Sequence, residues 1–163
     1  MTAVIVREAT AADAAAVLAM NNASTPHVNA LTTEEFSWLQ SHAAYLRVAE
    51  DATGVAGFVL CLAAGLDYWS DNYKWFAARH DDFLYLDRVV VAERARRLGV
   101  GRALYADLHR VAAGRWPRVT LEVNLRPANP NSVAFHEALG YEAVGVREYD
   151  DGEHAVQMFT KAV

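Results

Sequence analysis

Two kinds of hydrophobic spacing alternate along the chain. Apolar and β-branched runs with a period near two predict strands, and apolar residues three or four positions apart predict helices. The predicted strands cover residues 3–7, 45–50, 55–63, 83–92, 119–124, 142–149 and 155–160. The predicted helices cover residues 10–21, 32–42, 73–79, 99–113 and 131–139. Early antiparallel strands followed by a strand–helix–strand unit predict an α/β fold built on a mixed sheet.

Short polar motifs mark the ends of several of these elements. Thr10 and Asp13 form a variant of the capping box at the start of the first helix. The sequence of residues 51–54 is typical of a hairpin turn between two strands. Residues 23–31 have the composition of a loop, and residues 67–82, rich in Tyr, Trp and Asp, form an insertion. No repeat or linker divides the chain, so we expect one domain over residues 1–163.

A basic turn punctuated by glycine follows the strand at residues 83–92. Its charged and small residues are Arg96, Arg97, Gly99, Gly101 and Arg102, and an amphipathic helix begins within it. The start of a helix presents backbone N–H groups and the positive end of the helix dipole, which attract phosphate oxygens. Glycine lets the backbone approach such a group closely, and arginine adds charge. The turn therefore predicts a binding site for a pyrophosphate.

Two well-known phosphate loops do not fit this turn. A Walker A loop needs Lys followed by Ser or Thr after its last glycine, whereas Gly101 precedes Arg102 and Ala103. A dinucleotide fingerprint needs a third glycine or alanine where this chain has Leu104. The plain alternative is a helix that begins after a glycine turn, with its arginines in solvent.

A second motif lies downstream of the strand at residues 119–124. Its residues are Asn129, Phe135, Leu139, Gly140 and Tyr141. Together with Arg96-x-x-Gly99-x-Gly101, this arrangement resembles the GCN5-related N-acetyltransferase (GNAT) superfamily over residues 84–141. The resemblance implies an acyl-CoA N-acyltransferase fold. In that fold a mixed, mostly antiparallel central sheet contains a splayed parallel strand pair and carries flanking helices.

The resemblance also implies acetyl-CoA as cosubstrate and a set of contacts for it. Backbone amides of the strand would face the pantetheine arm and the thioester, at Val89, Val90 and Val91. The basic turn would hold the pyrophosphate, with Arg96, Arg97, Leu98, Gly99, Val100, Gly101 and Arg102. Asn129 matches an asparagine that contacts the pantetheine arm. Its alternative role is a local turn before Pro130.

Two carboxylates are candidates for the base that accepts a proton from the amine. Alternation along the strand places Thr120, Glu122 and Asn124 on one face. Glu122 matches the position of the glutamate base in ribosomal-protein alanine acetyltransferases. Asp87 is the rival, because a carboxylate in a mostly apolar strand is costly unless it is paired. The alternatives are an ion pair with a neighbouring arginine for Asp87 and a solvated strand face for Glu122; Glu122 is favoured.

His136 stands where the superfamily usually has a tyrosine near the thioester sulfur. By resemblance it would be the general acid that protonates the departing thiolate. Tyrosine, with a pKa of ~10, stays protonated at pH 7, whereas histidine, at ~6.5, is only partly so. The alternative is that His136 serves packing alone.

Composition excludes several classes of protein. Of 163 residues, 53% are hydrophobic and 21% are charged, the balance of a globular chain. A net charge of −5 argues against nucleic acid as a partner and favours cationic substrates. Cys61 is the single cysteine of the sequence and lies in an apolar run, so no disulfide is expected. The start of the chain lacks a signal-peptide layout. We therefore expect a cytoplasmic protein. No apolar stretch reaches the ~20 residues of a membrane span. The histidines outside the helix motif lack metal-ligand spacing, so no metal is expected: His27, His42, His80, His109 and His154.

These observations predict an acyltransferase, specifically an acetyl-CoA-dependent N-acetyltransferase. We expect direct transfer to a primary amine of a small molecule within a ternary complex. A protein N-terminal or peptide amine is the alternative acceptor, and a non-catalytic acyl-CoA-binding module is the alternative from another class. A homodimer is left open. The acceptor is not determined, because residues 23–42 and 67–82 carry no motif that identifies it.

Overall fold

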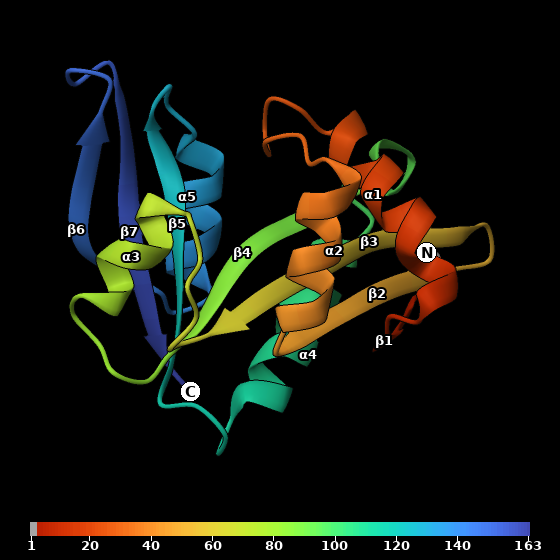
Figure 1. Cartoon of the computed structure of the whole chain (residues 1–163). Helices are drawn as coiled ribbons and strands as arrows, with labels where there is room; N and C mark the ends of the chain where they lie inside the picture. The colour runs from red at the N-terminus through yellow and green to blue at the C-terminus, as the bar shows by residue number, and fades with distance from the viewer. Residues whose placement is uncertain (1–2) are drawn as a thin grey trace. The chain divides into compact units, whose positions relative to one another are not determined.

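The computed structural model describes residues 3–163, and its elements are drawn in Figure 1. The strands are β1 (Ile5–Glu8), β2 (Tyr45–Asp51), β3 (Gly54–Ala63), β4 (Leu84–Val91), β5 (Arg118–Arg126), β6 (Glu142–Tyr149) and β7 (His154–Ala162). The helices are α1 (Ala14–Ala23), α2 (Thr33–His42), α3 (Asp71–Ala77), α4 (Val100–Ala112) and α5 (Pro130–Ala138). Two short 3₁₀ turns, Ala11–Asp13 and Glu93–Ala95, precede α1 and α4.

The seven strands follow the order β1-β2-β3-β4-β5-β7-β6. The ladders β1–β2, β2–β3, β5–β7 and β6–β7 are antiparallel, whereas β4 and β5 run parallel. The parallel ladder joins Leu84 with Val119 and Tyr85 with Thr120, well before β4 ends at Val91. The predicted fold class, a mixed and mostly antiparallel sheet with one parallel pair and flanking helices, is confirmed.

The chain forms two compact units, and each is described by itself. The first comprises Met1–Leu62 and Leu86–Val111. Within it, Gly57 on β3 faces β4 and α4 at close range. A Cβ at this position would lie 2.8 Å from the Val90 carbonyl oxygen and 3.3 Å from side-chain carbons of Val100 and Leu104. The absence of a side chain therefore allows α4 to pack against the strands.

The second unit comprises Ala63–Tyr85 and Ala112–Val163. The rings of Tyr73, Phe76, Phe83 and Tyr85 form an aromatic cluster in it, with centroid separations of 5.5–6.4 Å. The Tyr73 hydroxyl donates to the Ala63 carbonyl oxygen at 2.6 Å, which ties α3 to the end of β3. The inserted segment therefore contributes buried aromatic side chains to the core of this unit.

The observed ends of the elements differ from the predicted ones in places where side chains bind the backbone. The first strand begins at Ile5, not at residue 3. The Asp13 carboxylate accepts from the Thr10 backbone N–H at 2.7 Å and from the Arg7 guanidinium at 2.8 and 3.0 Å. These bonds close a 3₁₀ turn ahead of α1, and they hold the pKa of Asp13 well below its usual range. The capping box was predicted, but the ion pair with Arg7 was not.

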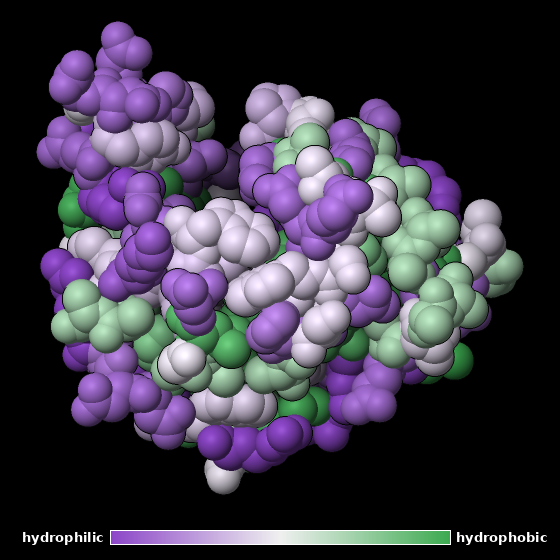
Figure 2. All heavy atoms as spheres, in the orientation of Figure 1, coloured by the Kyte–Doolittle hydropathy of each residue, from purple (hydrophilic) through white to green (hydrophobic). Residues whose placement is uncertain are grey.

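Hydrophilic side chains are spread over the face shown in Figure 2, interspersed with apolar ones. Large apolar side chains that remain exposed include Ile5, Leu98 and two residues of β6, Val144 and Val146. Among residues 3–163, no helix combines the length and apolar character needed to cross a membrane.

Candidate active site

Glu122 lies in β5, where two neutral groups of its own unit donate to it. The Tyr85 hydroxyl from β4 lies 2.8 and 2.9 Å from the two carboxylate oxygens. The Asn72 side chain, in the first turn of α3, donates Nδ2–H to Oε1 at 3.0 Å. The side chain is half-buried. The carboxylate is therefore fixed in direction, and neither donor is a cation that would neutralise it.

Sequence reasoning missed both donors. Tyr85 pairs in register with Thr120, and Glu122 is the next residue on the same face of β5. A tyrosine side chain reaches such a diagonal neighbour. The register of the parallel pair would have predicted the contact, but the sequence does not fix that register. Asn72 is brought to Glu122 by the course of α3, for which the sequence carried no signal.

Asp87, the rival base, lies in a buried ion pair. Its carboxylate accepts from Arg88 Nε at 2.7 Å, and the two side chains are only 4% and 5% exposed. The same guanidinium donates to Asn21 Oδ1 at 3.1 Å and to Asn29 Oδ1 at 3.2 Å. The pairing stated as the alternative for Asp87 is thus present. The Asp87 carboxylate is thus engaged in a buried structural ion pair, and Glu122 is kept as the favoured candidate.

The basic turn before α4 exposes its backbone. Arg97 has a φ of 65° and Gly99 a φ of 85°, and a Cβ at Gly99 would meet no atom within 4 Å. The side chains of Arg96 and Arg97 are exposed. The Ala103 backbone N–H donates to the Gly99 carbonyl oxygen at 3.0 Å, which joins the turn to the first turn of α4. The exposed glycine turn thus leads into the start of a helix, where backbone N–H groups attract anions.

The valines predicted to face the pantetheine arm alternate along β4. Val90 is 4% exposed, whereas Val89 and Val91 are half-buried. The last parallel pair of β4 with β5 is at Tyr85, so these three residues lie beyond that ladder. Their backbone role in cofactor binding remains a prediction.

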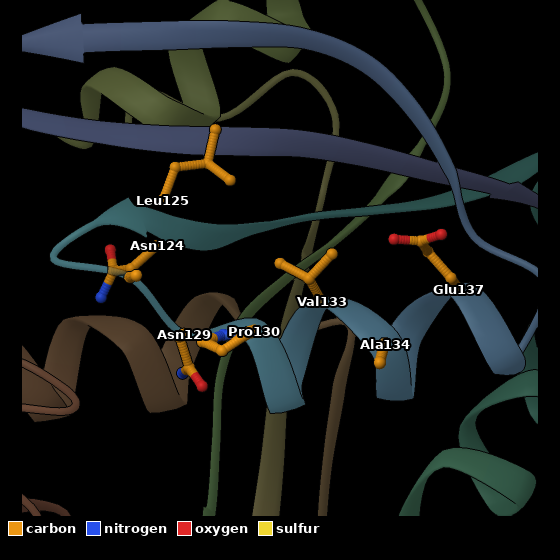
Figure 3. Close-up of a pocket in the computed structure, with 8 residues that line it drawn as sticks. Asn124, Leu125, Asn129, Pro130, Val133, Ala134 and Glu137 are labelled. Carbon is orange, nitrogen blue, oxygen red and sulfur yellow. The ribbon is translucent and has the colours of Figure 1, made fainter.

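A cavity of about 340 Å³ lies between the end of β5 and α5 (Figure 3). Its lining residues are Asn124, Leu125, Ala128, Asn129, Pro130, Val133, Ala134 and Glu137. Most of these side chains are apolar, and Figure 3 shows Val133, Ala134 and Glu137 along one side of α5. Asn129 begins the helix, with Oδ1 accepting from the Ser132 backbone N–H at 3.3 Å. Asn129 therefore has the local role stated as its alternative, and its contact with the pantetheine arm remains a prediction.

His136 is buried among rings of the second unit. Its side chain is stacked on Phe159 with centroids 6.2 Å apart and meets the edge of Tyr141 at 5.6 Å. Nδ1 lies 2.7 Å from the Ser132 carbonyl oxygen, so Nδ1 carries the proton of the neutral ring. Burial lowers the pKa of His136 below its ordinary value of 6.5. A ring that is neutral at pH 7 and donates its proton to a carbonyl is poorly suited to protonate a thiolate, which favours the packing role.

This burial predicts a dependence of stability on pH. Because the folded-state pKa is lowered, the unfolded chain binds more protons than the folded one below pH 6.5, and stability falls as the pH falls. In His136→Phe we expect a smaller loss of unfolding free energy between pH 7.5 and 5.5 than in the wild-type protein. Urea unfolding at the two pH values measures this difference. An unchanged loss would show that His136 is not held neutral by the fold.

The mixed sheet with one parallel strand pair, the half-buried carboxylate on β5 and the exposed glycine turn before α4 agree with the acyl-CoA N-acyltransferase fold that the motifs predict. The sequence profile of the Acetyltransferase (GNAT) family matches residues 15–141. The chain belongs to this family, and it is an acetyl-CoA-dependent N-acetyltransferase.

Several characterised proteins are similar to it. A phosphinothricin N-acetyltransferase from Streptomyces viridochromogenes is 32% identical over 144 residues, which cover 86% of this chain and 75% of the relative. The structure of a ribosomal-protein-alanine N-acetyltransferase from Brucella melitensis is 25% identical, with a TM-score of 0.74 over 98% of this chain and 99% of that one. NAA60 of Arabidopsis thaliana, solved with acetyl-CoA, is 15% identical, with a TM-score of 0.77 over 99% of this chain and all (100%) of that one.

Within the part of the chain that the structure describes, no His, Cys, Asp and Glu side chains cluster in a way that could hold a metal ion. Cys61 is fully buried in β3, and burial raises the pKa of its thiol well above the ordinary value. A buried thiol of this kind is a poor nucleophile.

Proposed function

We propose that the chain transfers the acetyl group of acetyl-CoA directly to a primary amine of a small molecule, with Glu122 as the base. The observation that carries this proposal is the Glu122 carboxylate, half-buried and fixed by two neutral donors, Tyr85 and Asn72. An amine is mostly protonated at neutral pH, and its nitrogen attacks only after losing a proton. Glu122 accepts that proton, and the net charge of −5 favours the approach of a cationic acceptor.

The exposed turn before α4 fits the pyrophosphate of acetyl-CoA. Gly99 leaves room for a phosphate where any other residue would project a Cβ, and Arg96 and Arg97 lie in solvent beside it. We assign the pyrophosphate to the backbone amides around Gly99, Val100 and Gly101. Acetyl-CoA, once bound, supplies the activated acetyl group as a thioester.

The pantetheine arm is assigned to two sets of residues, one in each unit. The cavity beside α5 offers this arm both apolar side chains and the amides of Asn124 and Asn129. The backbone amides of Val89, Val90 and Val91 are the proposed partners on β4. We place the reaction in the cytoplasm, in agreement with a single and buried cysteine.

A small-molecule acceptor is favoured by the relative that shares 32% of its residues, a phosphinothricin N-acetyltransferase. The second candidate is the amine of a protein N-terminus. Structural neighbours that act on ribosomal-protein alanine support it, one of them at 25% identity.

The proposal is tested by following thiol release from acetyl-CoA in the presence of a panel of amines. The panel contains phosphinothricin, simple primary amines and a peptide that begins with alanine. We expect release that depends on the amine and is fastest with a small molecule. Release with the peptide alone would move the assignment to protein acceptors, and the absence of release with every amine would contradict the proposed function.

A further inference from the structure

A row of hydrogen bonds connects three elements of the second unit and ends at Glu122. Arg147 on β6 donates Nε–H to Asn72 Oδ1 at 2.7 Å. Asn72 on α3 donates Nδ2–H to Glu122 Oε1 at 3.0 Å. Asn72 therefore uses both ends of its amide, one toward a cation and the other toward the carboxylate.

The cation decides which end of the amide faces Glu122. A guanidinium only donates hydrogen bonds, so it can bind only the oxygen of the Asn72 amide. The amide nitrogen is then directed at the carboxylate. With the opposite orientation, the Asn72 oxygen would face the Glu122 carboxylate, and two acceptors would meet without a proton between them. Arg147 thus orients a group that it shares with the candidate base.

Asn72 and Arg147 are themselves held in place by further contacts. Asn72 lies in the first turn of α3, which begins with a cap from Ser70 Oγ to the Tyr73 backbone N–H at 3.3 Å. The Arg147 guanidinium carbon lies 4.7 Å from the centroid of the Tyr149 ring. Within residues 3–163, Arg147 has no carboxylate within 4.0 Å, whereas Arg126 at the end of β5 is paired with Glu148 at 2.9 Å. Asn72 is thus a hydrogen-bond acceptor for the Arg147 guanidinium.

We propose that Asn72 is a positioning residue for Glu122 and that Arg147 fixes the orientation of Asn72. This inference rests on the proposed function, in which Glu122 is the base. It assigns a catalytic contribution to α3 and β6, two elements that carry none of the motifs of the sequence. Asn72 and Arg147 hold the carboxylate in the direction that proton transfer requires.

Several described groups of the second unit lie next to the carboxylate or behind its donors. Tyr85 faces it from β4 and Asn72 from α3, while its cross-strand partner on β7 is Met158. Arg147 is the charged group behind Asn72. Asn72→Asp would replace a donor by a second carboxylate. Two adjacent carboxylates share a proton, so the acidic limb of the rate profile should move to higher pH.

The test is a double-mutant cycle between Asn72→Ala and Glu122→Gln, with the fastest amine of the panel as acceptor. If Asn72 acts through Glu122, Asn72→Ala lowers kcat about tenfold in the wild-type background and changes it by less than about twofold in Glu122→Gln. Acetyl-CoA affinity, measured by calorimetry, stays within about twofold and shows that each variant is folded.

Substitutions of Asn72 and Arg147 give a second test, through the pH profile and the rate. In Asn72→Asp we expect the acidic limb of the kcat/KM profile to rise by at least one pH unit. Arg147→Lys keeps a cationic donor and should retain more activity than Arg147→Gln. Arg126→Gln is the matched control, since it removes an arginine that binds β6 without approaching Glu122, and it should leave kcat and the pH profile unchanged.

The outcomes separate this inference from the proposed function. A wild-type rate and pH profile in Glu122→Gln would overturn both the base and the positioning role. A slow Glu122→Gln variant in which Asn72→Ala still lowers kcat tenfold would keep the base and overturn the positioning role. An unmoved acidic limb in Asn72→Asp would likewise contradict it.

Discussion

Glu122→Gln should lower kcat at pH 7 by a factor of about 10² to 10⁴, the usual contribution of a general base. Glutamine keeps the shape of the side chain and an oxygen that can still accept from the Tyr85 hydroxyl. It cannot take a proton from the amine. As the pH rises, more of the acceptor is already deprotonated, so part of the rate should return. Steady-state thiol release between pH 6 and 10 measures both effects.

Asp87→Asn is the comparison for this variant. It removes one partner of the buried Asp87–Arg88 ion pair, so we expect lower stability, by about 3 kcal/mol or more, and little change in kcat of the folded fraction. Unfolding in urea measures the stability. Active-site titration gives the folded fraction, from which the kcat of the folded protein is calculated. If Asp87→Asn has a greatly reduced kcat and Glu122→Gln keeps the wild-type kcat, the base is Asp87 and not Glu122.

Gly99→Val should abolish measurable binding of acetyl-CoA. The residue has a φ of 85°, a conformation that disfavours any Cβ and most of all a branched one. The added side chain would also occupy the open space where the pyrophosphate is expected to approach the backbone. Calorimetry with acetyl-CoA gives the affinity directly, and we expect a loss of at least a hundredfold.

Gly114→Val separates the loss of the ligand from strain in the backbone. Gly114 follows the C-terminus of α4, has a φ of 77° and likewise meets no atom within 4 Å of an added Cβ. Both variants should therefore lose similar amounts of stability, whereas only Gly99→Val should lose acetyl-CoA. Equal affinities for acetyl-CoA in the two variants would contradict the assignment of the pyrophosphate to this turn.

The sequence predicts most of the elements because local patterns decide them. The apolar runs of the strands and the capping box at Thr10 and Asp13 act within a few residues. The same holds for the helix that starts after Asn129. The largest disagreements are at ends, where a side chain such as Arg7 reaches across to close a turn.

The candidate site was predicted only in part. Glu122 and the basic turn belong to motifs, and motifs are local. The groups that give Glu122 its surroundings come from distant positions: Tyr85 is 37 residues away, and Asn72 is 50 residues away. Arg147 lies 75 residues from Asn72. Contacts of this kind depend on strand register and on the course of α3, which hydrophobic spacing does not specify.

Mass spectrometry with acetyl-CoA labelled in its acetyl group tests direct transfer to an amine most directly. The protein is incubated with the labelled cofactor, first without an acceptor and then with the fastest amine of the panel. We expect the mass of the protein to stay unchanged in both incubations, and the amine to gain one labelled acetyl group. A labelled acetyl group on the protein that passes to the amine, or an amine that remains unlabelled, would contradict this mechanism.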